Sequence, residues 1–107
     1  MTDPSDEGFG AEADTVLRER LVRVARLTWD QASALPEANG ESESIGGHRH
    51  DITTFRQSLG TGILVTVQIA RPAVLGLASR HWERGLVFVQ GEEPREATQA
   101  ELDLTGS

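Results

Sequence analysis

The sequence contains no cysteine, no lysine and no tyrosine among its 107 residues. Without cysteine, the chain cannot form a disulfide, a thiolate zinc site, an iron–sulfur cluster or a thiol nucleophile. Without lysine, it cannot form a Schiff base or hold phosphate through a P-loop, and without tyrosine it has no phenolic acid or nucleophile. These absences exclude several large classes of enzyme before any motif is considered.

Long apolar runs are also missing, and acidic residues dominate the charge. No segment approaches the roughly 18 consecutive apolar residues that a transmembrane helix needs. The acidic first ten residues do not resemble an export signal, so we expect no membrane association and a cytoplasmic location. Ten basic residues against 17 acidic ones give a formal net charge of −7. We therefore expect no nucleic-acid partner, because the phosphate backbone would repel the chain at long range.

The length permits one ordinary domain. Residues 1–10 are polar, acidic and interrupted by proline and glycine, which predicts a disordered tail. We expect a single domain over residues 11–104 and a short C-terminal tail over residues 105–107.

An amphipathic helix is predicted from Ala11 to Leu35, where apolar residues recur at helical spacing. Its apolar stripe comprises Leu17, Leu21, Val24, Ala25, Thr28, Ala32 and Leu35. Pro36 would end the helix. Thr28 and Gln31 also fit a capping box, so the alternative is a second, short helix that begins at Thr28.

The pattern changes to that of strands in the middle of the chain. Residues 36–49 are turn formers and carboxylates, which predicts a solvated loop. β-Branched and aromatic residues predict a strand over Asp51–Leu59, and strict alternation predicts another over Ile63–Ala70. Gly60-Thr61-Gly62 fits a hairpin connection between them, because glycine supplies the positive φ that such turns need.

The last third of the sequence is less regular. Residues 73–82 fit a strand or a short helix, and the lack of helical periodicity favours a strand. Glu83-Arg84-Gly85 predicts a turn into a buried strand over Leu86–Gln90. Thr98 and Glu101 fit a second capping box, which predicts a short C-terminal helix.

Together these elements predict an α+β domain. An N-terminal amphipathic helix would pack on a three- or four-stranded antiparallel sheet, with a short C-terminal helix after it. The helix stripe and the apolar face of Ile63–Ala70 would bury each other, since neither can be buried otherwise. Because a domain of this size is only marginally stable, homodimerisation would be an economical way to bury further surface.

One candidate site gathers the three histidines of the chain. In a strand, His48 and His50 would point the same way, and His81 and Glu83 have the same spacing. Imidazole and carboxylate groups are ligands for zinc or iron, so these four residues are a candidate metal site. A candidate acid–base pair is His50 or His81 with Asp51 or Glu83. The alternative is that the histidines are simply exposed, since no nucleophile motif accompanies them. Nothing else in the sequence implies a cofactor.

A second candidate site is an interface with a protein partner of unknown identity, through Trp29, Trp82, Arg18 and Arg26. Tryptophan and arginine are enriched in interfaces. They could instead cover the rim of the sheet and form a salt-bridged solvent face. We favour a non-catalytic protein-binding or regulatory module, which predicts an exposed apolar patch that includes a tryptophan. The alternatives are a small enzyme or metal-dependent binder that uses the histidine and carboxylate cluster, and an inhibitor of a basic protein.

Overall fold

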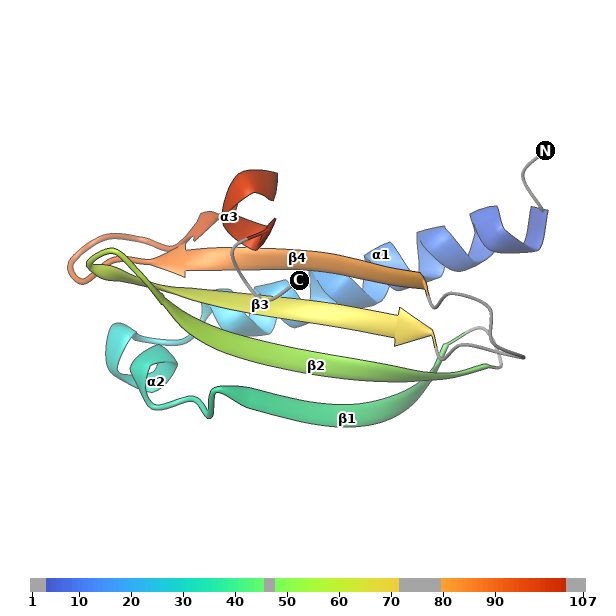
Figure 1. Cartoon of the computed structure of the whole chain (residues 1–107), viewed down its shortest axis with the longest axis horizontal. Helices are drawn as coiled ribbons and strands as arrows, with labels where there is room; N and C mark the ends of the chain where they lie inside the picture. The colour runs from blue at the N-terminus through green and yellow to red at the C-terminus, as the bar shows by residue number, and fades with distance from the viewer. Residues whose placement is uncertain (1–3, 46–47, 72–79, 104–107) are drawn as a thin grey trace.

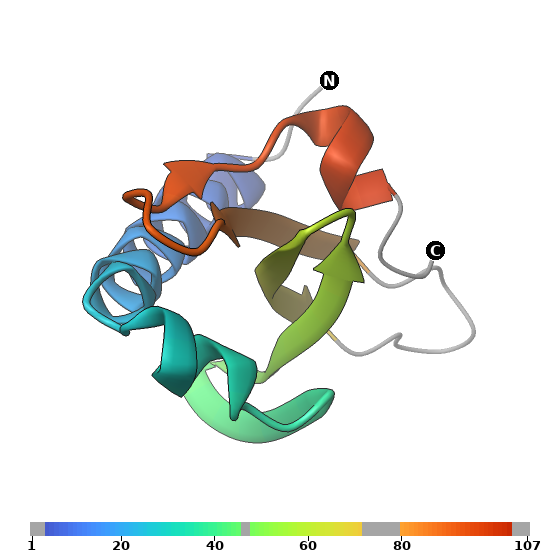
Figure 2. The same ribbon diagram turned by 90° about the vertical axis from the view of Figure 1, so that its left-hand side faces the viewer.

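The computed structural model describes residues 4–45, 48–71 and 80–103. A long N-terminal helix crosses one face of a five-stranded antiparallel sheet, and a short C-terminal helix packs against the other face (Figures 1 and 2). The predicted α+β class is therefore confirmed, with five strands in place of the three or four expected.

Helix α1 spans Pro4–Ala25 and begins seven residues before the predicted start at Ala11. It thus includes most of the segment for which we expected a disordered tail. One feature of the sequence favours this earlier start. The fixed φ of a proline, here Pro4, suits the first turn of a helix.

The predicted helix is divided, as the alternative with a second short helix proposed. Helix α1 ends at Ala25, and α2 spans Trp29–Ser33. The Thr28 hydroxyl accepts a hydrogen bond from the Gln31 backbone N–H at 3.1 Å, and the Gln31 side chain accepts one from the Thr28 N–H at 2.9 Å. This reciprocal capping satisfies two backbone donors that would otherwise lack an intrahelical acceptor, and it starts a new helix in a new direction.

Each strand pairs with its neighbours in sequence, so the sheet is a meander with the order β1-β2-β3-β4-β5. The strands are β1 (Ala38–Ile45), β2 (His48–Leu59), β3 (Gly62–Arg71), β4 (Arg80–Phe88) and β5 (Arg95–Glu96). The predicted hairpin between β2 and β3 is confirmed, and Gly60 has the positive φ, 59°, that the turn requires.

Strand β1 corrects the prediction of a loop over residues 36–49. The segment lacks the alternation of apolar residues that marks a strand because it lies at the edge of the sheet. Only Ile45 of its eight residues is buried. Its extended conformation follows from pairing with β2 along its whole length, and such tertiary pairing outweighs local propensity.

Strand β4 corrects the predicted turn at Glu83-Arg84-Gly85, which lies in the middle of the strand. Gly85 marks a close approach of neighbouring atoms. A Cβ at this position would lie 2.9 Å from the Val65 backbone oxygen and 3.0 Å from Leu102 Cδ2. The glycine therefore allows α3 (Gln99–Asp103) to pack directly on the strand. The segment for which strand and helix remained open falls largely within residues 72–79, outside the described residues.

The core lies between α1 and the facing side of the sheet, as predicted. Leu17 packs with Val67 and Ile69, and Leu21 packs with Ile63 and Val65. On the opposite side, Leu102 of α3 is buried beside Gly85. The sheet residues Leu64, Thr66 and Val87 on that side are buried as well. The predicted Thr98–Glu101 capping box starts α3, with hydrogen bonds of 2.9 and 3.2 Å. Both faces of the sheet thus contribute to burial.

Candidate functional site

Strand β1 forms an edge of the sheet and exposes seven of its eight residues. Within the described ranges it pairs with β2 alone. The Arg56 N–H donates to the Glu37 oxygen at 2.9 Å, which fixes the phase of the hydrogen-bond ladder. Every second residue of β1 therefore directs its N–H and C=O away from β2, toward the open edge. These residues are Ala38, Gly40, Ser42 and Ser44.

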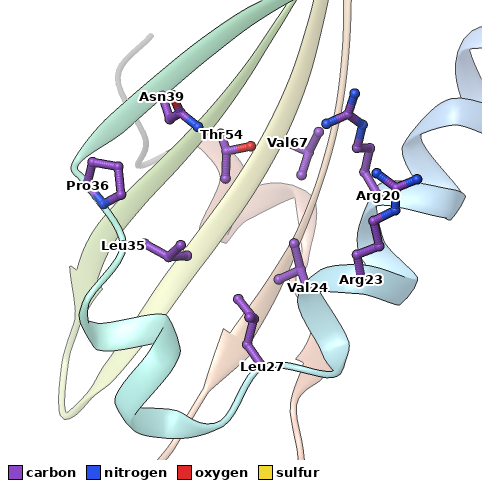
Figure 3. A pocket seen from close by; sticks show the side chains of 9 residues that line it. All are labelled: Arg20, Arg23, Val24, Leu27, Leu35, Pro36, Asn39, Thr54 and Val67. Atoms are coloured by element: carbon purple, nitrogen blue, oxygen red, sulfur yellow. The ribbon is translucent and has the colours of Figure 1, made fainter.

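A pocket of about 170 Å³ lies beside the first residues of β1, between the sheet and the C-terminal half of α1 (Figure 3). It is lined by Arg20, Arg23, Val24, Leu27, Leu35, Pro36, Asn39, Thr54 and Val67. In Figure 3 the two arginines reach in from α1, and Asn39 and Thr54 lie across from them on the sheet. Most of the remaining lining is aliphatic. The pocket thus combines an apolar interior with polar groups at its rim.

The pocket's wall opposite the sheet is formed where α1 ends and the chain turns into α2. The Leu27 N–H donates to the Val24 oxygen at 3.0 Å, and the capping box at Thr28 then redirects the chain. Just after α2 in the sequence, the Leu35 carbonyl accepts a hydrogen bond from the Arg56 Nε at 2.5 Å. This contact ties the α2–β1 connection to β2. Hydrogen bonds of the backbone and of Arg56 therefore hold the two lining residues Leu27 and Leu35 in place.

The two arginines of the pocket differ in their charge partners. Arg20 forms ion pairs with Glu41 and with Glu43, the latter at 2.6 Å between Nη2 and Oε2. Arg23 is exposed and forms no hydrogen bond or ion pair through its side chain with any residue in the described ranges. The charge of Arg20 is therefore compensated within the fold, whereas Arg23 presents a positive charge at the rim. A guanidinium in this setting can bind a carboxylate through two parallel hydrogen bonds.

The histidine and carboxylate candidates are distributed over both faces of the sheet. His50 is fully buried on the face that α1 covers, with Ile52. Glu83 is two residues before Gly85 in β4, so both lie on the same face of the sheet. This is the face that α3 packs against, opposite to the face of His50. The backbone of His48 pairs with Ile45 and that of His81 with Ala70, but their side chains lie outside the described residues.

The structure therefore does not bring His50 and Glu83 together. Among the side chains that the structure describes, no group of three or more histidine, aspartate or glutamate residues has the arrangement of a metal site. A shared ligand sphere would require these groups to meet on one side of the sheet.

The four candidates for a protein interface lie apart from the pocket. Trp29 and Trp82 are half-buried and pack against the two halves of the core. Arg18 is exposed and pairs with Asp14 at 2.6 Å, one turn away on the same helix, and Arg26 is exposed. Over the described ranges, the exposed large apolar side chain is Val22, at 51%, so the tryptophan patch that we expected is not found there.

Sequence reasoning missed the features that the structure brings together at β1. Leu27 and Arg23 were placed on a helix with no pocket beside it, and Asn39 was placed in a loop. One signal was available in the sequence. Glutamates occur at positions 41 and 43, two residues apart, so in a strand both carboxylates would lie on one face. There they could form ion pairs with a single arginine.

Comparisons of the sequence with protein-family models and with curated proteins, and of the fold with solved structures, gave no match. No helix in the described part of the chain has the length and apolar character needed to cross a membrane. The β1 edge and the adjacent pocket are therefore the features from which we infer a function.

Proposed function

We propose that this protein is a small non-catalytic protein-binding module, and that it binds an extended segment of a partner along β1. The observation that carries the proposal is the open edge of β1, with four residues whose backbone N–H and C=O groups point away from β2. An extended peptide can add to such an edge as a further strand, with main-chain hydrogen bonds that supply affinity. We also propose that the protein acts in the cytoplasm.

The two edges of the sheet differ in a way that supports this choice. Strand β5 consists of the two residues Arg95 and Glu96, and such short strands are a common protection against unwanted pairing. Strand β1 has eight residues and no proline. A long edge without these protections is suited to receive a partner.

Charged residues can also protect an edge, and β1 carries Glu41 and Glu43. Arg20 reaches both carboxylates from α1. This bridge holds the two side chains against the helix and offsets part of their charge, so they present a smaller barrier to an added strand. Arg20 thus offsets one of the two negative charges at this edge, and a net charge of −1 remains there.

A second copy of the chain fits this edge less well than a different protein does. If two β1 strands paired in antiparallel fashion about Ser42, Glu41 of each copy would lie opposite Glu43 of the other. Like charges directly opposite each other destabilise a strand pair. Both copies would also carry a net charge of −7. We therefore favour a heterologous partner.

The test uses a display library of random linear twelve-residue peptides, selected on the wild-type protein. Ser42→Pro removes an outward N–H without removing a hydrogen bond to β2, and proline is tolerated on edge strands. Ser42→Ala is the matched control, because it loses the Ser42–Asp51 hydrogen bond but keeps the N–H. We expect selected peptides to lose about tenfold or more in affinity for Ser42→Pro and to bind Ser42→Ala nearly as well as wild type.

Three outcomes would overturn the proposal. The first is that no peptide is selected, and the second is that peptides bind the two variants equally. The third is a two-chain mass in native mass spectrometry that reverts to one chain in Ser42→Pro, because this would show that a second copy occupies the edge. Thermal unfolding of both variants confirms that each is folded before binding is compared.

A further inference from the structure

We propose that the partner segment inserts one apolar side chain into the pocket beside β1 and places a carboxylate on Arg23. This inference rests on the proposed function and adds the chemistry by which the partner is recognised. Specificity in strand addition comes from pockets that accept alternate side chains of the added strand, because main-chain hydrogen bonds are the same for every sequence.

The size of the pocket fits a side chain better than it fits a metabolite. Its volume is about 170 Å³. A cavity of about 150 Å³ holds one benzene molecule, whereas sites for drug-sized ligands are about 300–1,000 Å³. A leucine, isoleucine or phenylalanine side chain therefore suits the space among Val24, Leu27 and Leu35 (Figure 3).

The position of Asn39 connects the pocket to the open edge. Asn39 belongs to β1 and also lines the pocket. In an added strand, the residue opposite Asn39 would point its side chain to the same face of the sheet, with its Cβ about 4.5–5.5 Å from that of Asn39. That face is the one covered by α1. One extended segment can thus form hydrogen bonds with β1 and reach the pocket.

The charges at the rim define the second element of recognition. Arg20 is compensated by Glu41 and Glu43, whereas Arg23 has no ion pair with the described residues. A carboxylate next to the apolar anchor would pair with Arg23. The net charge of −7 repels a strongly acidic partner at long range, so we infer a single carboxylate and not an acidic run.

The pocket is tested directly with isocaproate, which carries the isobutyl group of leucine and a carboxylate. Binding is followed by methyl NMR signals of Val24, Leu27 and Leu35. We expect saturable shifts at millimolar concentration. The uncharged isocaproamide should bind about tenfold more weakly, because it cannot form the charge-assisted hydrogen bonds with Arg23.

Arg23→Gln is the decisive variant, and Arg26→Gln is its matched control. Both arginines are exposed, but Arg23 lines the pocket and Arg26 does not. We expect Arg23→Gln to weaken isocaproate about tenfold and Arg26→Gln to leave its affinity nearly unchanged. Equal effects of the two variants, or no shifts of these methyl signals, would overturn the inference.

The peptides selected on the β1 edge separate the failure of this inference from that of the proposed function. We expect their affinity to fall with Ser42→Pro and also with Arg23→Gln. Peptides that need the open edge but are indifferent to Arg23→Gln would overturn the inference and leave the proposed function standing. Binding of isocaproate without any edge-dependent peptide would overturn both and identify the pocket as a site for a small free carboxylate.

Discussion

Gly85 of β4 and Leu102 of α3 meet at the point where the C-terminal helix packs on the sheet. A Cβ on Gly85 would lie 3.0 Å from Leu102 Cδ2 and 2.9 Å from the Val65 backbone oxygen. The leucine could move away, but the oxygen belongs to the paired strand and could not move without distorting the sheet. We therefore expect Gly85→Ala to lower the free energy of unfolding by about 1–3 kcal/mol, measured by urea denaturation.

Gly40→Ala provides the control for this change. Gly40 also lies in a strand, but a Cβ there would meet only Thr53 Oγ1, at 3.8 Å, which is an ordinary contact. We expect its unfolding free energy to stay within about 0.5 kcal/mol of wild type, as for most surface substitutions. Similar losses in the two variants would contradict the close approach of α3.

Arg20→Gln tests the bridge from α1 to β1. Without the guanidinium, Glu41 and Glu43 lose their shared ion-pair partner. Because partly exposed ion pairs contribute little, we expect the free energy of unfolding to fall by less than about 1 kcal/mol. The local effect should be clearer, with faster hydrogen exchange of the β1 amides that bond to β2. Arg18→Gln, which removes only the ion pair with Asp14 within α1, should leave exchange in β1 unchanged.

Thr66→Val is expected to stabilise the protein. Thr66 is buried on β3, and its Oγ1 makes no hydrogen bond within the described part of the chain. Valine has nearly the same shape and removes the unsatisfied hydroxyl, so the free energy of unfolding should rise by about 1 kcal/mol. Thr53→Val, at a half-exposed position, should change it less. A loss of stability in Thr66→Val would show that the hydroxyl is satisfied in solution.

Glu101 makes the stability of the protein depend on pH in acid. The hydrogen bond from Arg95 lowers the pKa of Glu101 to about 2, assisted by the backbone N–H of Thr98. In the unfolded chain, the pKa of a glutamate is about 4.3. The stabilising contribution is therefore complete above about pH 4.3 and is lost as the pH falls toward 2.

Glu101→Gln retains an oxygen that can cap α3 but cannot form the ion pair with Arg95. We expect urea denaturation of this variant to show a smaller loss of stability than wild type between about pH 4.5 and pH 2.5. Glu93→Gln is the control, since Glu93 is exposed and forms no ion pair with the described residues. If both variants followed the wild-type profile, the assigned role of Glu101 would be wrong.

Sequence patterns correctly predicted strands that bury one face, turns that need glycine and helices that begin with a capping residue. The alternation of Ile63–Ala70, the glycine turn at Gly60 and the capping residues Thr28 and Thr98 all have their expected roles. Each depends on residues close together in sequence. Local chemistry is sufficient to specify such features.

The misplaced elements depend on contacts between distant residues. The edge strand β1 has no apolar alternation because almost nothing covers it, and its conformation comes from pairing with β2. Gly85 resembles a turn residue in sequence, but its lack of a side chain accommodates Leu102, which is 17 positions later. The pocket unites α1, the α2–β1 connection and three strands, so no single segment could reveal it.

The meander order of the strands has a consequence for how the chain folds. Every strand pairs with the one just before or after it, so each hairpin can form by closing a short loop. Helix α1 is different, because it packs mainly against β3 and β4, which are synthesised much later. During translation, the apolar side of this helix stays exposed to solvent until β3 and β4 have been synthesised. We therefore expect α1 to be synthesised before the sheet but to pack only after β3 and β4 have paired.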